Sequence, residues 1–162
     1  MSIRRIRAGD GSRLRAIRLA ALADEPNAFG ETLRQAGALS DQEYDARASA
    51  WAEGDAAVFL VTETEQNRWI GMVGARNQDG RIAMVSMWVS LMYRRRGLGV
   101  ELIDACLAWA ATTPAREVYL FVGDYNLPAQ ALYAAMGFEP SGRTAPLDWN
   151  TEVTELEMVR PL

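Results

Sequence analysis

The sequence predicts a single mixed α/β domain spanning residues 1–162, and three features support this prediction. Three strand-like runs in the middle of the chain are separated only by short turns, which is typical of an antiparallel meander. Stretches with apolar residues at helical spacing flank the meander on both sides. A Gly-x-Gly loop joins the last strand of the meander to the following helix, so helices and strands are expected to share one core.

The N-terminal third is expected to form a short strand and two helices. In order, we expect a strand at Ile3–Arg7, a helix capped by Asp10 or Ser12 that continues through Leu22, a break at 25–30 and a helix from Asp41 to about Trp51. The break contains Pro26 and Gly30, which interrupt a helical pattern.

The rest of the chain alternates between strands and helices. The expected strands of the meander are Ala57–Thr62, Trp69–Ala75 and Ile82–Val89, with turns at 66–67 and 78–80. After the Gly-x-Gly helix come a strand at Glu117–Val122, a short helix at Pro128–Met136, and two final strands, from Phe138 and at Glu152–Val159. Gly137 is expected to end the short helix, because glycine readily adopts the left-handed conformation common at that position.

Two absences exclude several kinds of catalysis. The chain has no histidine, so Ser-His-Asp, Cys-His and histidine–metal sites are unavailable. It also has no lysine, because all 17 basic residues are arginine, which excludes Schiff-base chemistry and a P-loop lysine. The single cysteine, Cys106, lies on an apolar helical face and is interpreted as a buried hydrophobic residue. We expect no metal.

Charge and hydropathy limit the partners. The formal net charge of −4 argues against general nucleic-acid binding. No apolar run approaches the length of a membrane span, and the Met-Ser-Ile-Arg-Arg start lacks a signal-peptide core. A lone cysteine also fits a reducing compartment. These features predict a cytoplasmic protein with no membrane partner, and a homodimer stays open.

The most informative segment is 87–99, where an apolar strand is followed by three arginines and Gly-x-Gly. Arginine carries the wrong charge for a helix N-terminus, where free N–H groups and the helix dipole favour anions. The guanidinium groups of Arg94–Arg96, the adaptable backbone at Gly97 and Gly99 and the helix N-terminus would all favour a phosphate group. The segment alone is equally compatible with a solvated basic turn whose glycines serve the strand-to-helix geometry.

A second segment, Asn126 to Phe138, narrows the choice. It places an asparagine at a strand end, a short helix and a Gly-Phe exit. The pattern Arg94-x-x-Gly97-x-Gly99, followed by Asn126-x-x-Ala129-x-x-Leu132-Tyr133-x-x-x-Gly137-Phe138, resembles the Gcn5-related N-acetyltransferase (GNAT) superfamily. Both motifs occur in the family's order and at a plausible separation, and the predicted elements agree along the whole chain.

The resemblance implies a GNAT-like fold and an acetyl-CoA-dependent acyltransferase. The fold would be a central, mostly antiparallel twisted sheet of six to seven strands with flanking helices, and a strand pair at the cofactor site would splay apart to admit the thioester. The resemblance assigns acetyl-CoA binding to Met87, Trp88, Val89, Arg94, Arg95, Arg96, Gly97, Leu98, Gly99, Val100 and Asn126. It makes Tyr133 the general acid near the sulfur, whereas out of context this tyrosine would be a packed aromatic of its helix.

The implied reaction moves an acetyl group to a primary amine of a small molecule or a peptide by direct attack in a ternary complex. An alkylammonium, with a pKa of about 10.4, must lose a proton, and the departing thiolate must gain one. A backbone N–H near Val89 could stabilise the oxyanion. Glu31 and Asp124 are candidate bases, and a water relay without a single base is the alternative. Candidates for the acceptor pocket, which could equally fill the core, are Phe29, Trp88, Tyr125 and Trp149.

Two other functions fit parts of the pattern. A dinucleotide-binding oxidoreductase would need a third glycine where the chain has Leu102. Its ribose-binding acid would end the next strand, whereas Glu117 begins it, so the sequence disfavours this function. A non-catalytic acyl-CoA-binding sensor or interaction module of the same fold stays open, because Tyr133 and Asn126 argue against it only weakly.

Overall fold

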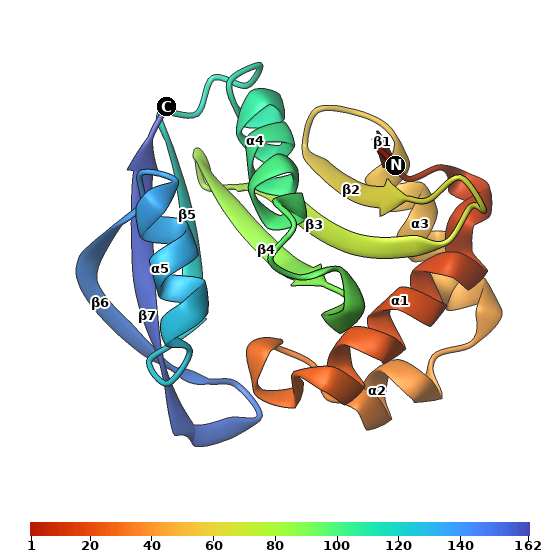
Figure 1. The fold of residues 1–162 in the computed structure, drawn as a ribbon, viewed down its shortest axis with the longest axis horizontal. Coiled ribbons are helices and arrows are strands. Elements are labelled where there is room, and N and C mark those ends of the chain that lie inside the picture. Colours follow the sequence, from red (N-terminus) through yellow and green to blue (C-terminus); the bar gives the residue numbers. More distant parts are fainter.

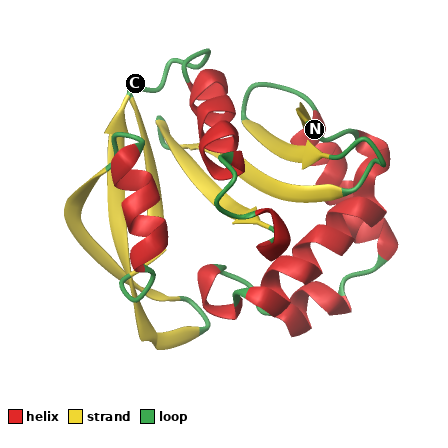
Figure 2. Ribbon diagram, viewed as in Figure 1, coloured by secondary structure: helices red, strands yellow, loops and turns green.

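All seven strands form one twisted sheet, with helices packed on both of its faces (Figures 1 and 2). The computed structural model describes residues 1–162. The strand order is β1-β2-β3-β4-β5-β7-β6, and every neighbouring pair is antiparallel except β4–β5. The predicted mixed α/β fold, with a mostly antiparallel sheet and flanking helices, is confirmed.

The elements follow one another with short connections. The strands are β1 (Ser2–Arg5), β2 (Ala57–Glu63), β3 (Trp69–Gln78), β4 (Arg81–Val89), β5 (Glu117–Gly123), β6 (Glu139–Leu147) and β7 (Asn150–Pro161). The helices are α1 (Gly11–Asp24), α2 (Leu33–Ala38), α3 (Asp41–Ala52), α4 (Leu98–Ala110) and α5 (Leu127–Ala135). Short 3-10 helices lie at Ala8–Asp10, Pro26–Ala28 and Leu91–Tyr93. None of the helices has both the length and the apolar character needed to cross a bilayer.

The predicted elements occur in the predicted order, with two notable differences. Strand β1 ends at Arg5 rather than at Arg7, because Arg7 already belongs to the turn into α1, where its N–H donates to the Asp10 carboxylate (2.8 Å). Helix α2 is missing from the sequence prediction. It has only six residues and includes Gly37, so its helical signal is weak, and its Thr32 cap lies within a polar stretch.

Two apolar clusters lie on opposite faces of the sheet. One packs α4 and α5 against the strands, and the other packs α1 and α3 against them. In β2, Val58 and Leu60 belong to the first cluster, whereas Phe59 and Val61 belong to the second. Successive side chains of a strand point to opposite faces, so this uninterrupted apolar run is buried on both sides.

Strands β4 and β5 pair only briefly and then diverge. Their parallel pairing is limited to Ile82–Val118 and Ala83–Tyr119. Further along, β4 has a β-bulge at which Ser86 and Met87 oppose the single residue Val73 of β3, and Ser86 has a φ of 57°. Because a bulge bends and twists its strand, the later part of β4 turns away from β5, as Figure 1 shows. The predicted splayed strand pair is confirmed.

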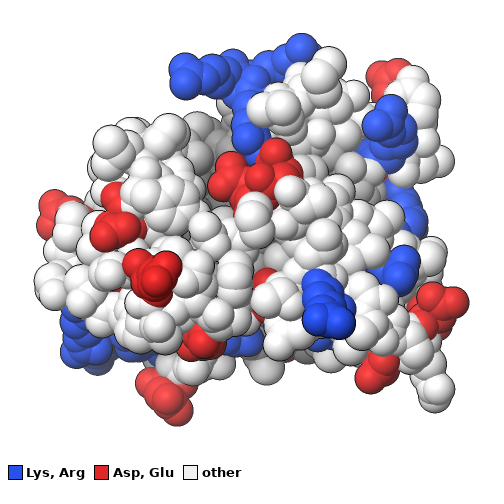
Figure 3. Space-filling view, turned by 90° about the horizontal axis from the view of Figure 1, so that it is seen from below, with Lys and Arg blue, Asp and Glu red and all other residues white.

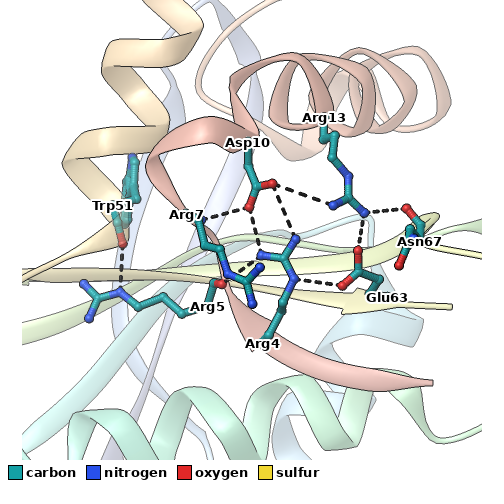
Figure 4. Close-up of polar contacts among 8 residues, drawn as sticks. All are labelled: Arg4, Arg5, Arg7, Asp10, Arg13, Trp51, Glu63 and Asn67. Carbon is teal, nitrogen blue, oxygen red and sulfur yellow. Dashed lines mark hydrogen bonds and ion pairs between the residues drawn. The ribbon is translucent and has the colours of Figure 1, made fainter. Parts of the chain in front are cut away.

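Charged side chains join β1 and β2 to the start of α1 (Figure 4). Arg4 donates through Nε to Glu63 and through Nη1 to Asp10, both at 2.8 Å. Arg13 of α1 pairs with the same two carboxylates. Asp10 stands at the predicted cap position of α1, but its carboxylate accepts from Arg4 and from the Arg7 N–H instead of capping the helix. The network therefore holds the edge of the sheet to α1.

We expect Glu63→Gln to lower the free energy of unfolding by about 1–2 kcal/mol at neutral pH, because it removes the charge that binds two guanidinium groups. Hydrogen bonds from Arg4 and Arg13 lower the pKa of Glu63 from 4.5 to about 2. A carboxylate with a lowered pKa stabilises the fold fully above its unfolded pKa and loses that effect as the pH falls through the folded value. The difference between variant and wild type should thus shrink between pH 4.5 and about 2.

Denaturant unfolding over this pH range measures the effect. The matched control is Glu65→Gln, since Glu65 is exposed and has no ionic partner. Equal stability of the two variants at neutral pH would contradict the proposed contribution of the network.

Candidate active site

A cleft of about 900 Å³ lies between the diverging ends of β4 and β5 and reaches the first turns of α4 and α5. It brings the two sequence motifs together. The predicted residues in its lining are Met87, Trp88, Val89, Arg94, Arg95, Gly97, Gly99, Val100, Asn126 and Tyr133. The other two predicted residues do not line the cleft. Leu98 is buried in the core, and Arg96 is exposed, with its guanidinium 5.7 Å from the Tyr93 ring.

The N-terminus of α4 presents unpaired backbone donors to this cleft. The N–H groups of Leu98, Gly99 and Val100 have no acceptor within the protein, since the first bond of this turn runs from Glu101 to the Gly97 carbonyl (3.0 Å). Gly97 adopts a left-handed conformation (φ 86°), which glycine reaches without strain. Free amides at the positive end of a helix dipole form an anion-binding site, so the cleft fits a pyrophosphate at this point.

Close packing explains the second glycine of the loop. A Cβ on Gly99 would lie 3.2 Å from Leu132 Cδ2 and 3.5 Å from Met87 Cε. Gly99 thus lets the start of α4 approach both α5 and β4. The two glycines serve different purposes, backbone conformation at Gly97 and close approach at Gly99.

The three loop arginines have separate surroundings. Arg94 is turned inward, because its Nε donates to the Val89 carbonyl (2.8 Å) and its guanidinium pairs with Asp24 and with Glu25. Arg95 is exposed, lines the cleft and has no ionic partner. Of the loop cations in the cleft lining, Arg95 is therefore the one left free to bind an anion.

Asp24, the last residue of α1, is a site residue that the sequence did not indicate. Its carboxylate accepts from the Trp88 indole (2.9 Å) and pairs with Arg94, so it links α1 to the end of β4 and to the arginine loop. Nothing local marks it, because its partners lie more than 60 residues away. Figure 3 shows acidic side chains directly beside basic ones next to a hollow in this face of the molecule.

Asn126 and Tyr133 lie at the start and in the body of α5. The Asn126 carbonyl oxygen caps the helix by accepting from the Ala129 N–H (3.3 Å), which leaves its amide N–H₂ group without a partner in the protein. The Tyr133 ring packs edge-on against Phe138, with centroids 6.0 Å apart. The sequence predicted a site role and a packing role for Tyr133, and the geometry accommodates both.

The Tyr133 hydroxyl has no hydrogen-bond partner, and it is not enclosed. The only enclosed side-chain polar atoms without a partner are Thr62 Oγ1 and Trp69 Nε1, so the Tyr133 oxygen is open to the cleft that its residue lines. Burial, with a smaller effect of Cys106, raises the pKa of Tyr133 above its ordinary value of 10.0. The phenol is therefore protonated at neutral pH and can donate a proton.

A second cleft, of about 590 Å³, lies on the opposite face of the gap between β4 and β5. Its walls come from α1, α3, the 28–31 segment and the strands. The residues that line both clefts are Ala28, Met84, Val85, Ser86, Leu120 and Phe121. The two clefts therefore meet where the strands separate, at the bulge of Ser86.

The structure separates the candidate bases. Glu31 lines the second cleft but binds Arg18 (2.6 Å) and Arg47 (3.2 Å). Burial would raise the pKa of Glu31, but the hydrogen bonds from Arg47 and Arg18 outweigh it and lower the pKa, which makes this carboxylate a weak proton acceptor. Asp124 is exposed and lines neither cleft.

Glu155 of β7 is a further carboxylate that the sequence did not indicate. It lines the second cleft, is half-buried and has no hydrogen-bond or ionic partner for its side chain. Burial, assisted by the nearby charge of Asp148, raises the pKa of Glu155 above 4.5. Only the pairing of β7 beside β5 brings it to the cleft, so no local pattern could have found it.

The candidate aromatic residues are distributed over both faces. Phe29 lines the second cleft and Trp88 the first, whereas Tyr125 and Trp149 line neither. The Trp149 indole donates to the Phe29 carbonyl (2.9 Å), which ties the β6–β7 turn to the segment after α1 at one end of the second cleft.

The sequence profile of the acetyltransferase (GNAT) family matches residues 20–138. The chain therefore belongs to this family of acyltransferase enzymes. Human N-acetyltransferase 8 is 34% identical over 92 residues, which span 53% of this chain and 40% of the relative. The match thus covers less than half of that relative's length.

Solved structures of low sequence identity have the same fold. An acetyltransferase of the GNAT family from Streptococcus pneumoniae has a TM-score of 0.80 at 20% identity, with 99% of both chains covered. A spermidine N-acetyltransferase chimera of Vibrio cholerae SpeG and hSSAT has a TM-score of 0.73 at 16% identity, covering 99% of this chain and 96% of that one. At such identities the likeness concerns the fold.

We expect Gly97→Ala to weaken acetyl-CoA binding about ten-fold, because a Cβ strains the left-handed backbone that orients the loop amides. Gly54→Ala is the matched control. Gly54 has a similar φ (81°), also has open space around its Cα, and lies outside both clefts.

Both variants should lose about 1 kcal/mol of stability, measured by denaturant unfolding. Only Gly97→Ala should change the dissociation constant of acetyl-CoA, measured by titration calorimetry. Equal affinity in the two variants would remove the loop from the binding site.

Proposed function

We propose that the chain is an acetyl-CoA-dependent N-acetyltransferase that moves an acetyl group to a primary amine of a small molecule or a peptide. The observation that supports this most strongly is the meeting of two clefts in the gap between β4 and β5. The larger cleft has the anion-binding start of α4 and the open hydroxyl of Tyr133. The smaller cleft reaches the same gap from the opposite face, so an amine could approach a thioester held there.

When bound, acetyl-CoA supplies the activated acyl group, and the chain's own residues bind and orient it. The free N–H groups of Leu98, Gly99 and Val100 hold the pyrophosphate, assisted by the free guanidinium of Arg95. The backbone of Met87–Val89 pairs with the extended arm, to which the unpartnered Asn126 amide also donates. Arg94 acts indirectly, because its pairs with Asp24 and Glu25 fix the loop.

An ammonium group loses two protons on becoming an amide, and the departing thiolate gains one. The amine nitrogen forms the C–N bond as the C–S bond breaks, and the departing thiolate takes the proton of the Tyr133 hydroxyl. The first proton, lost before attack, passes from the ammonium group to Glu155, whose raised pKa improves it as a proton acceptor. The second proton, released as the C–N bond forms, returns through water to the Tyr133 oxygen. Both groups act without histidine, which the chain lacks.

We expect Tyr133→Phe to lower kcat roughly ten- to a hundred-fold, because the general acid is lost while the ring that packs against Phe138 remains. Acetyl-CoA affinity and the melting temperature should stay close to wild type. Stopped-flow measurement of thiol release, under conditions in which chemistry limits the rate, tests this. Unchanged turnover would return Tyr133 to a packing role.

Release of free thiol from acetyl-CoA across a panel of primary amines tests the function as a whole. We expect amine-dependent release with at least one class of acceptor. Tight binding of acetyl-CoA without release for any amine would indicate an acyl-CoA-binding sensor instead. Absence of binding at millimolar acetyl-CoA would contradict the proposal altogether.

A further inference from the structure

The second cleft is lined by five charged side chains, and three of them already have partners within the protein. Arg18 donates to Ser86 Oγ (2.8 Å) and to Glu31 (2.6 Å), and Arg47 donates to both oxygens of Glu31 (3.2 and 3.3 Å). Both oxygens of Glu31 and both terminal nitrogens of Arg18 therefore already have hydrogen-bond partners. The groups left without a partner are Arg76 and Glu155.

Arg76 presents an unpaired guanidinium to the cleft. It lies on β3 between Ala57 of β2 and Ala83 of β4, its cross-strand partners. Their methyl side chains leave room beside the arginine and offer no acceptor. Arg76 is exposed and makes no hydrogen bond or ion pair, so its planar fork of donors is free to bind a carboxylate.

Glu155 presents an unpaired carboxylate from the other end of the cleft. Its cross-strand partner on β5 is Gly123, which lies four residues beyond Tyr119, where β4 and β5 last pair. Glu155 is therefore beside the open end of the gap, whereas Arg76 is level with the closed end at Ala83. Because a strand rises about 3.3 Å per residue, the backbone positions of Arg76 and Glu155 are roughly 13 Å apart along the strand direction.

We propose that the acceptor is an amino compound with a carboxylate several bonds from its amine, an inference that rests on the proposed acetyl transfer. Arg76 binds the carboxylate, assisted by the partly exposed Arg47, and Glu155 binds the ammonium group near the gap. A cleft of about 590 Å³ is large enough for such a small molecule. The acceptor thus satisfies both groups that the protein leaves unpaired.

The charge of the lining disfavours purely cationic acceptors. Three arginines against two glutamates leave one positive charge, and Glu31 is already shared by two guanidinium groups. A diamine or polyamine would place its second ammonium beside Arg76, where like charges repel. The amine end alone has a free carboxylate.

Matched acceptors test this assignment. We compare γ-aminobutyrate and ε-aminohexanoate with butylamine and hexylamine, and with the diamines of the same length, measuring kcat/KM from thiol release. The amino acids should be used about ten-fold better than the alkylamines, the usual size of one charge-assisted contact. The diamines should be used worst. Equal or poorer use of the amino acids would overturn the proposal.

Substitutions then assign the two ends. Arg76→Met should abolish the preference for amino acids without lowering kcat/KM for alkylamines, and Arg76→Lys should retain part of it. Arg34→Met is the control, since Arg34 is exposed, unpaired and outside both clefts. Glu155→Gln should lower kcat/KM for every amine, because it removes both the ammonium contact and the proton acceptor, while leaving the preference for amino acids intact. A preference that survives in Arg76→Met would exclude Arg76 as the carboxylate site.

Binding separates this inference from the proposed transfer. With CoA present, calorimetry should give ε-aminohexanoate about ten-fold higher affinity than hexylamine in wild type, and equal affinities in Arg76→Met. Such a result without thiol release would refute acetyl transfer but support Arg76 as a carboxylate-binding residue. Thiol release with equal affinities for the two ligands would keep transfer and refute the role of Arg76.

Discussion

The proposed site depends on the interruption of backbone pairing between β4 and β5. Two residues of β4 oppose one residue of β3 at the Ser86 bulge, and Ser86 takes a positive φ. A bulge costs ladder hydrogen bonds but bends the strand, and here the bend opens the middle of an otherwise continuous sheet. Both clefts share their lining at this place, so a single backbone irregularity sets where two ligands could meet.

Ion pairs and hydrogen bonds beside the clefts fix the segments that surround the gap between β4 and β5. Asp24 connects α1 to Trp88 and to Arg94, while Trp149 of the β6–β7 turn donates to the Phe29 carbonyl. The Trp149–Phe29 contact bridges the two halves of the sheet on either side of the β4–β5 gap, whereas the Asp24 contacts lie within the β1–β4 half and hold the arginine loop to α1. The ion pairs with Asp24 and Glu25 also occupy Arg94, so Arg95 is the arginine of the cleft lining in this loop that has no ionic partner.

A chain without histidine or lysine must do its chemistry with other groups. The proposed anion site consists of backbone N–H groups at the start of α4, which carry no titratable charge, together with arginine, which stays protonated. In the proposed mechanism, proton transfer falls to Tyr133 and Glu155, and burial raises the pKa of each. The same physical term, desolvation of the charged form, prepares one group to keep its proton and the other to accept one.

The sequence by itself determined the mixed α/β class and the order of the elements other than α2. Both follow from local signals: apolar spacing, the turn at Gly137 and the glycines of the loop at Gly97 and Gly99. The residues proposed to bind the cofactor in the first cleft were implied by the resemblance of two motifs to a known family, because the loop alone is also compatible with a solvated basic turn. Helix α2 was too short to have such a signal. The partners of Arg94, the place of Glu155 and the pairing of Glu31 were decided only in the tertiary structure, because each depends on side chains from segments distant in the chain. Local patterns specify backbone conformation. Which charged side chains of a cleft stay unpaired depends on ion pairs with distant segments, and these form only in the tertiary structure.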